Sequence, residues 1–268
     1  MDKNDLGEVA EQWFNRYLDD RGYTFQEKPD PGGARRAGRL VQAGDRPVLC
    51  EVTAFTADGR FEDIAVPEIG AEEILVGEPV ARDLTETLQP IREQISAAAS
   101  AGLRRWKDKD GPLVLVLADP MDKPIPLEPS LVVAAMYGDP EDARPAAGEP
   151  AWVAGEKGRM TARYPSVSAV AVLRLRTYAQ DWVDAWISAN SHAYSSAAQM
   201  LTAIRRYDHA APDGDYVVLD VFETLSPEAV PLPRDIFNGP RDARYGPTPE
   251  GDGLMPVPVG PENLSRVP

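Results

Sequence analysis

An acidic residue stands in the middle of an apolar run at residues 48–55, VLCEVTAF, which has the length and composition of a buried strand. Side chains alternate between the two faces of a strand, so Glu51 and Thr53 share one face while Cys50 and Val52 share the other. A carboxylate costs free energy in apolar surroundings unless something binds it. Glu51 therefore either points to a solvated face or faces a cation, which would be a metal ion or an arginine.

The elements that would position Glu51 follow from the hydrophobic pattern of the chain. Helices are expected at about residues 5–20, 90–107, 130–136, 178–189 and 195–206. Strands are expected at about residues 23–25, 38–42, 48–55, 113–118, 168–175 and 215–224, with a hairpin turn at residues 43–46. This order predicts an α/β fold with a mixed central sheet that is flanked by helices.

Proline and glycine dominate the chain after Ser226, and no hydrophobic period continues there. We therefore expect a single α/β domain over residues 1–225 and a C-terminal extension over residues 226–268. The extension is interpreted either as extended chain that lies on the domain or as partly disordered chain.

Charge and composition limit the classes of function. The chain has 268 residues, a net charge of -15 and a pI of about 4.6, which argues against a surface that binds nucleic acid as a whole. A local basic patch is still expected near the hairpin, where the sequence places Arg35, Arg36, Arg39 and Arg46. No apolar run approaches the roughly 18 residues of a membrane span, and the polar start is not a signal peptide. These features predict a soluble, cytoplasmic protein without membrane partners, whose oligomeric state the sequence leaves open.

Two segments of the chain resemble a known family. They are EQWFNRYLDDRGY at residues 11–23 and GRLVQAGDRPVLCEVTAF at residues 38–55. Together they are similar to the core of the PD-(D/E)XK nucleases, and in particular to their small resolvase-like members. The resemblance extends over roughly residues 6–118 and implies the restriction-endonuclease-like αβββαβ core of that superfamily.

The resemblance also implies a catalytic site. In the family, an Asp on the first hairpin strand and a Glu-x-Lys motif on the second bind a divalent cation that activates water. Glu51 takes the Glu position, but Thr53 stands where the Lys is expected and Gly38 where the Asp is expected. A rearranged site would bind Mg²⁺ or Mn²⁺ through Glu51, Asp30 and Glu11, with Arg92 as a charge stabiliser.

Two functions are compatible with these residues. The first is a divalent-metal-dependent nuclease with a rearranged site. The second is a catalytically inactive descendant that binds a protein, a nucleic acid or a small ligand. In the second case Glu51 is expected to pair with an arginine, and Glu11 to be a solvated helix residue.

Overall fold

We describe the chain from a computed structural model. The residues it describes are 3–28, 38–44, 46–55, 84–106, 111–120, 127, 129–138, 152–153, 160, 163–179, 181, 185, 214–239, 241–251 and 253–257.

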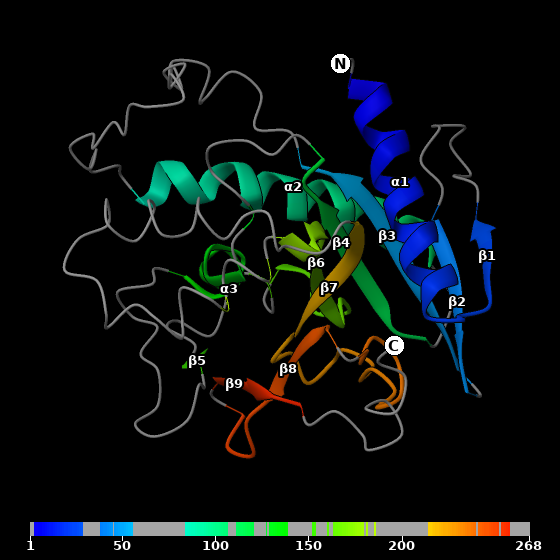
Figure 1. Cartoon of the computed structure of the whole chain (residues 1–268). Helices are drawn as coiled ribbons and strands as arrows, with labels where there is room; N and C mark the ends of the chain where they lie inside the picture. The colour runs from blue at the N-terminus through cyan, green and yellow to red at the C-terminus, as the bar shows by residue number, and fades with distance from the viewer. Residues whose placement is uncertain are drawn as a thin grey trace, which may run out of the picture.

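The strands of these residues form one mixed sheet, in the order β1-β2-β3-β4-β6-β7-β8-β9-β5 (Figure 1). β3 runs parallel to β4 and β4 to β6, whereas β1, β2 and β3 are joined in antiparallel fashion. The predicted α/β class with a mixed central sheet is therefore confirmed. The strands are β1 (Phe25–Lys28), β2 (Gly38–Ala43), β3 (Arg46–Ala54), β4 (Leu113–Ala118), β5 (Trp152–Val153), β6 (Ala169–Thr177), β7 (Asp215–Glu223), β8 (Ala243–Pro247) and β9 (Gly253–Pro256).

Helix α1 (Lys3–Asp20) covers one face of the sheet. Its buried stripe, Leu6, Ala10, Phe14 and Tyr17, recurs every three or four residues, as an amphipathic helix requires. A turn at Gly22 follows the last helical residue, Asp20. The φ of 71° at Gly22 is a conformation that costs glycine little, and Tyr23 N donates to Leu18 O there. The predicted helix over residues 5–20 is confirmed.

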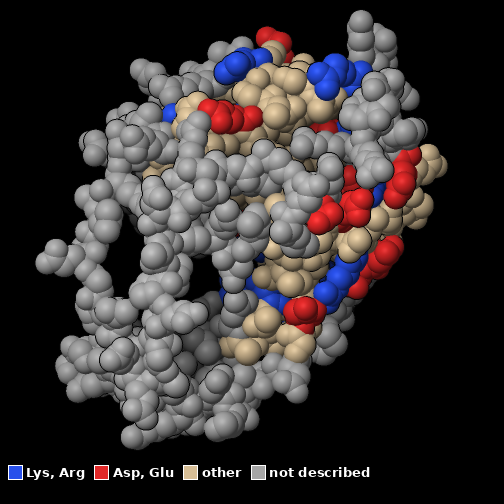
Figure 2. Space-filling view, turned by 90° about the horizontal axis from the view of Figure 1, so that it is seen from above, with Lys and Arg blue, Asp and Glu red and all other residues tan. Residues whose placement is uncertain are grey.

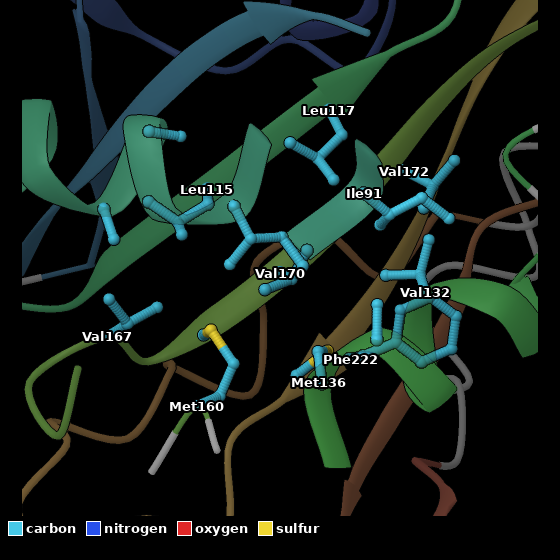
Figure 3. Packing of buried hydrophobic residues seen from close by; sticks show 14 of the residues in the cluster. Ile91, Leu115, Leu117, Val132, Met136, Met160, Val167, Val170, Val172 and Phe222 are labelled. Atoms are coloured by element: carbon cyan, nitrogen blue, oxygen red, sulfur yellow. The ribbon is translucent and has the colours of Figure 1, made fainter. Parts of the chain in front are cut away.

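Helices α2 (Leu84–Arg105) and α3 (Pro129–Tyr137) cover the opposite face. Figure 3 shows Ile91 of α2 and Val132 and Met136 of α3 beside apolar side chains of β4 and β6. α2 begins at Leu84, earlier than the predicted start at Pro90, so the proline lies inside the helix and removes one backbone hydrogen bond. The sheet thus has one helical layer on each face, and consecutive residues of β3 face different layers.

The described part of the extension, within residues 226–257, packs on the domain and continues its sheet. β8 runs parallel to β7, and β9 pairs with β8. Phe237 is fully buried among the aromatic rings of α1, and its backbone N donates to Tyr23 Oη at 2.8 Å. Of the two interpretations of the extension, chain lying on the domain therefore describes these residues. The strands β8 and β9 were not predicted from the sequence.

Two buried charges hold the extension in place. Arg244 donates to Glu223 at 2.8 Å and to the carbonyl oxygens of residues 232, 233 and 236. The carboxylate of Asp242 is fully buried and accepts hydrogen bonds from Tyr17 Oη at 2.8 Å and from Gly239 N at 2.9 Å. It also accepts from Leu219 N at 3.2 Å and from Arg21 at 3.3 Å. The extension is thus joined to α1 and β7 by polar contacts as well as by apolar packing.

Candidate functional site

Glu51 lies in β3 with only 1% of its surface exposed, and its carboxylate forms an ion pair with Arg105 of α2. The two side chains are 2% and 3% exposed, so water does not screen the pair. Of the alternatives that the sequence left open, Glu51 faces a cation. The guanidinium of Arg105 supplies positive charge there. A buried carboxylate with a buried arginine partner is a stable arrangement only while both partners remain.

A glycine brings Arg105 to Glu51. Gly102 lies one turn before Arg105, and a Cβ at this position would come within 2.9 Å of Leu113 Cδ1 and 3.5 Å of Glu51 Cβ. A side chain at residue 102 would push the last turn of α2 away from the sheet, so glycine permits the close approach. Arg105 was not predicted as a partner of Glu51, because nothing in the local pattern shows which strand the end of a helix contacts.

Thr53 is 3% exposed and contributes to the same contact between β3 and α2. Its hydroxyl oxygen accepts a hydrogen bond from Gln94, which also donates to Ala54 O at 2.9 Å. Gln94 and Arg105 are about three turns apart on α2, and both face β3. At the position where the resemblance implies a lysine, this chain therefore has a neutral side chain that helps join the helix to the sheet.

Arg92 lies on α2 roughly 200° around the helix axis from Gln94. Ser96, one turn after Arg92 on the same side of the helix, accepts a hydrogen bond from Tyr164 Oη at 2.9 Å. Arg92 is thus placed on the side of α2 that faces away from the contact between Gln94 and Thr53. Arg105 supplies a guanidinium that pairs with Glu51.

Glu11 lies on the other face of the sheet. Its carboxylate accepts a hydrogen bond from Arg39 at 3.0 Å, and Arg39 also donates to Asn15 at 2.7 Å. Arg39 pairs with Cys50 across the hairpin, and the side chain of Cys50 belongs to the apolar cluster on the α1 side. Glu11 and Glu51 are therefore separated by the sheet, and the expectation that Glu11 is solvated is replaced by an ion pair with a buried arginine.

These placements decide how well the predicted ligands fit a divalent cation. Mg²⁺ and Mn²⁺ need several oxygen ligands around one point. Glu51 and Glu11 each have an arginine partner and lie on different faces, while Asp30 is outside the described residues. Within the described part of the chain, no group of three or more His, Cys, Asp or Glu residues is arranged to hold a metal ion. The described donors do not fit the metal that the resemblance implies.

The register of the hairpin agrees with the sequence analysis. Arg39 pairs with Cys50 in antiparallel β2 and β3, which places Gly38 opposite Glu51. A Cβ at Gly38 would lie 3.6 Å from Arg105 Cδ, on the same face as the ion pair. The position where the resemblance implies an aspartate is thus next to Arg105.

The predicted basic patch near the hairpin is not formed by its described members. Arg39 is 1% exposed, and it is paired with Glu11 and lies 3.5 Å from Glu27. Arg46 is exposed, but it lies opposite Ala43 in the pairing of β2 with β3. Ala43 is four residues, or roughly 13 Å, along β2 from Arg39. Arg35 and Arg36 lie outside the described residues. On the face shown in Figure 2, the described Lys and Arg side chains are scattered among acidic ones.

Of the described helices, none is long and apolar enough to span a bilayer. Comparison of the chain with protein-family models, with curated proteins and with solved structures finds no match.

Proposed function

We propose that this protein is a descendant of the restriction-endonuclease-like fold that binds a ligand and does not cleave nucleic acid. The element order α1-β1-β2-β3-α2-β4, with antiparallel β1, β2 and β3 and parallel β3 and β4, supports the αβββαβ relationship. The observation that carries the proposed loss of cleavage is the buried ion pair between Glu51 and Arg105.

The ion pair disfavours metal-dependent cleavage for an electrostatic reason. In a nuclease of this kind, the carboxylate must attract a divalent cation, which in turn activates water. Here the charge of Glu51 is already balanced by a guanidinium inside the protein, and an arginine stays protonated, so it is a poor general base. Thr53 supplies no positive charge. The ion pair of Glu51 and the neutral side chain of Thr53 thus lie at the two positions where the family binds its metal and activates water.

The charge of the chain favours a ligand other than a nucleic acid. A phosphate backbone is bound by clustered basic side chains. The net charge is -15, and Arg39 of the expected patch is buried in an ion pair. A metal-dependent nuclease with ligands Glu51, Asp30 and Glu11 remains the alternative, and it would have to gain its metal in competition with Arg105.

Thermal unfolding with and without metal tests this proposal. Millimolar Mn²⁺ or Mg²⁺ should raise the melting temperature no more than NaCl of equal ionic strength, because a ligand stabilises the folded state only if it binds that state. Single- and double-stranded DNA and RNA should stay intact in the same buffers.

The variants Glu51→Gln and Glu8→Gln make the test specific. Glu8 is an exposed residue of α1 and serves as the control. A stabilisation by Mn²⁺ that disappears in Glu51→Gln but persists in Glu8→Gln would overturn the binding role and favour the nuclease.

A further inference from the structure

The extension contains the single Asn-Gly pair of the chain, Asn238–Gly239. In such a pair the backbone N of the glycine can attack the side-chain carbonyl carbon of the asparagine, because glycine has no Cβ to hinder the approach. A bond forms between Gly239 N and Asn238 Cγ, the bond from Cγ to Nδ2 breaks, and ammonia leaves with the proton of the N–H group. Water then opens the succinimide ring at either carbonyl, which gives aspartate or isoaspartate. The net reaction consumes one water and releases one ammonia.

Tertiary packing requires a glycine at residue 239. A Cβ at this position would lie 2.5 Å from Arg21 Nε and 2.5 Å from Asp242 Oδ2, so a side chain has no room there. The glycine thus permits the close contact between the extension and the end of α1. The same glycine makes the preceding asparagine reactive, so the contact and the reactive pair come together.

The attacking atom is held back while the extension is docked. Gly239 N donates to the carboxylate of Asp242 at 2.9 Å, and that carboxylate is fully buried. The attack requires Gly239 N to lose its proton, and a carboxylate beside it disfavours the negative charge that develops on the nitrogen. Asn238 is only 5% exposed, which limits the access of hydroxide and of the water that opens the ring. Docking therefore slows both steps of the reaction.

Contacts with α1 also fix the backbone that precedes Asn238. Phe237 has a φ of 52°, which residues with a side chain seldom adopt, and its ring is fully buried. The ring centroids of Tyr23 and Tyr17 lie 5.8 and 6.3 Å from that of Phe237, and Phe237 N donates to Tyr23 Oη. A strained backbone persists only while its surroundings impose it. When the extension leaves α1, this constraint ends and the carboxylate of Asp242 loses its hydrogen bond from Tyr17.

We propose that Asn238 is a modification site that deamidates when the extension leaves α1, and that the product keeps the extension from docking again. Deamidation replaces a buried amide by a carboxylate, and burial of a charge costs more than burial of an amide. The new charge is added to a turn that already holds the buried carboxylate of Asp242. Isoaspartate also lengthens the backbone by one carbon between Phe237 N and Gly239 N, which both donate to fixed acceptors. This inference does not depend on the proposed binding role.

Mass spectrometry of the tryptic fragment 235–241 measures the reaction, because the fragment gains mass when the amide becomes an acid. At pH 8.5 and 37 °C, the folded chain should deamidate at least tenfold more slowly than the same chain in 8 M urea. Without urea, Asp242→Asn should deamidate at least tenfold faster than the parent. Glu228→Gln is the control, since it removes an exposed negative charge from the same extension and should react at the parent rate.

Amide hydrogen exchange in residues 235–241 measures docking. Asn238→Asp has the side chain of one product and should exchange these amides at least tenfold faster than the parent. Gln26→Glu is the matched control, because it makes the same change from amide to acid at an exposed residue of β1 and should leave this exchange unchanged.

Three results would overturn the proposal. The first is an equal rate of deamidation in buffer and in urea, which is measured on the parent and so does not depend on whether a variant folds. The second is an equal rate in Asp242→Asn and the parent. The third is exchange in Asn238→Asp at the parent rate, which would show that the product docks as well as the original chain.

Discussion

Replacing Arg105 by methionine tests whether the ion pair with Glu51 is a structural feature of this fold. The Glu51 carboxylate is 2% exposed, so the variant would remove the guanidinium of an ion pair that lies in the interior. Removing one partner of a buried pair costs about 3–5 kcal/mol of unfolding free energy. Arg104→Met is the control, because Arg104 is exposed and such a change costs less than about 0.5 kcal/mol.

The pH dependence follows from the same carboxylate. In Arg105→Met the folded chain gains by taking up a proton at Glu51, and it does so at a pH where the unfolded chain stays ionised. The folded variant then binds more protons than the unfolded one, so its stability rises as the pH falls, by up to about 1.4 kcal/mol per pH unit. The loss relative to the parent should therefore be smaller at pH 5 than at pH 7.

Urea unfolding at 25 °C, followed by tryptophan fluorescence, measures both effects. The double variant Glu51→Leu with Arg105→Met replaces the pair by apolar side chains of similar size, and it should recover most of the loss, within about 1 kcal/mol of the parent. A loss below about 1 kcal/mol in Arg105→Met, or no recovery in the double variant, would refute the assignment of Glu51 to a structural ion pair. It would also reopen the question of a metal at this position.

Two further predictions concern the buried polar groups. Asp242→Asn should lower the unfolding free energy by about 2–3 kcal/mol, since the buried side chain loses its charge beside Arg21 and part of its hydrogen bonding. Asp235→Asn is the control, because Asp235 is an exposed residue of the same segment. Equal urea midpoints for the two variants would contradict this prediction. Burial raises the pKa of Tyr17 and Tyr137 above the ordinary value near 10. Above pH 10 the unfolded chain therefore loses these protons first, and the unfolding free energy should fall by about 1.4 kcal/mol per pH unit for each tyrosine. Urea titrations at pH 9, 10 and 11 check this, and the Tyr17→Phe, Tyr137→Phe double variant should show a flatter dependence.

Much of the fold could be predicted from local patterns. The stripe of α1, the apolar run of β4 and the turn between β2 and β3 each depend on residues close in sequence. At that turn, Ala43 pairs with Arg46 and Gly44 has a φ of 53°, which glycine adopts readily. Once the turn is placed, the register follows, and with it the position of Gly38 opposite Glu51. The shared face of Glu51 and Thr53 follows from the same alternation.

Some elements were displaced or missed because distant residues decide them. The strand expected at residues 23–25 begins only at Phe25, and Tyr23 instead contacts Phe237 through its hydroxyl. β8 and β9 have no clear hydrophobic period. β8 forms against β7 and β9 against β8, while Arg244 satisfies three carbonyl oxygens of the preceding loop. Such contacts between residues far apart in sequence leave no mark on local periodicity.

The sequence by itself determined that Glu51 lies on an apolar strand, where its carboxylate faces either solvent or a cation. Only the tertiary structure decided that Arg105 is a cation bound there, since Arg105 is far from Glu51 in sequence and reaches it because Gly102 lets α2 approach the sheet. Likewise, the sheet lies between Glu11 and Glu51 and separates two acids that the resemblance implied as ligands of one metal ion. The type of a residue determines which interaction it needs when it is buried, whereas the packing of helices on the sheet determines which residue provides that interaction.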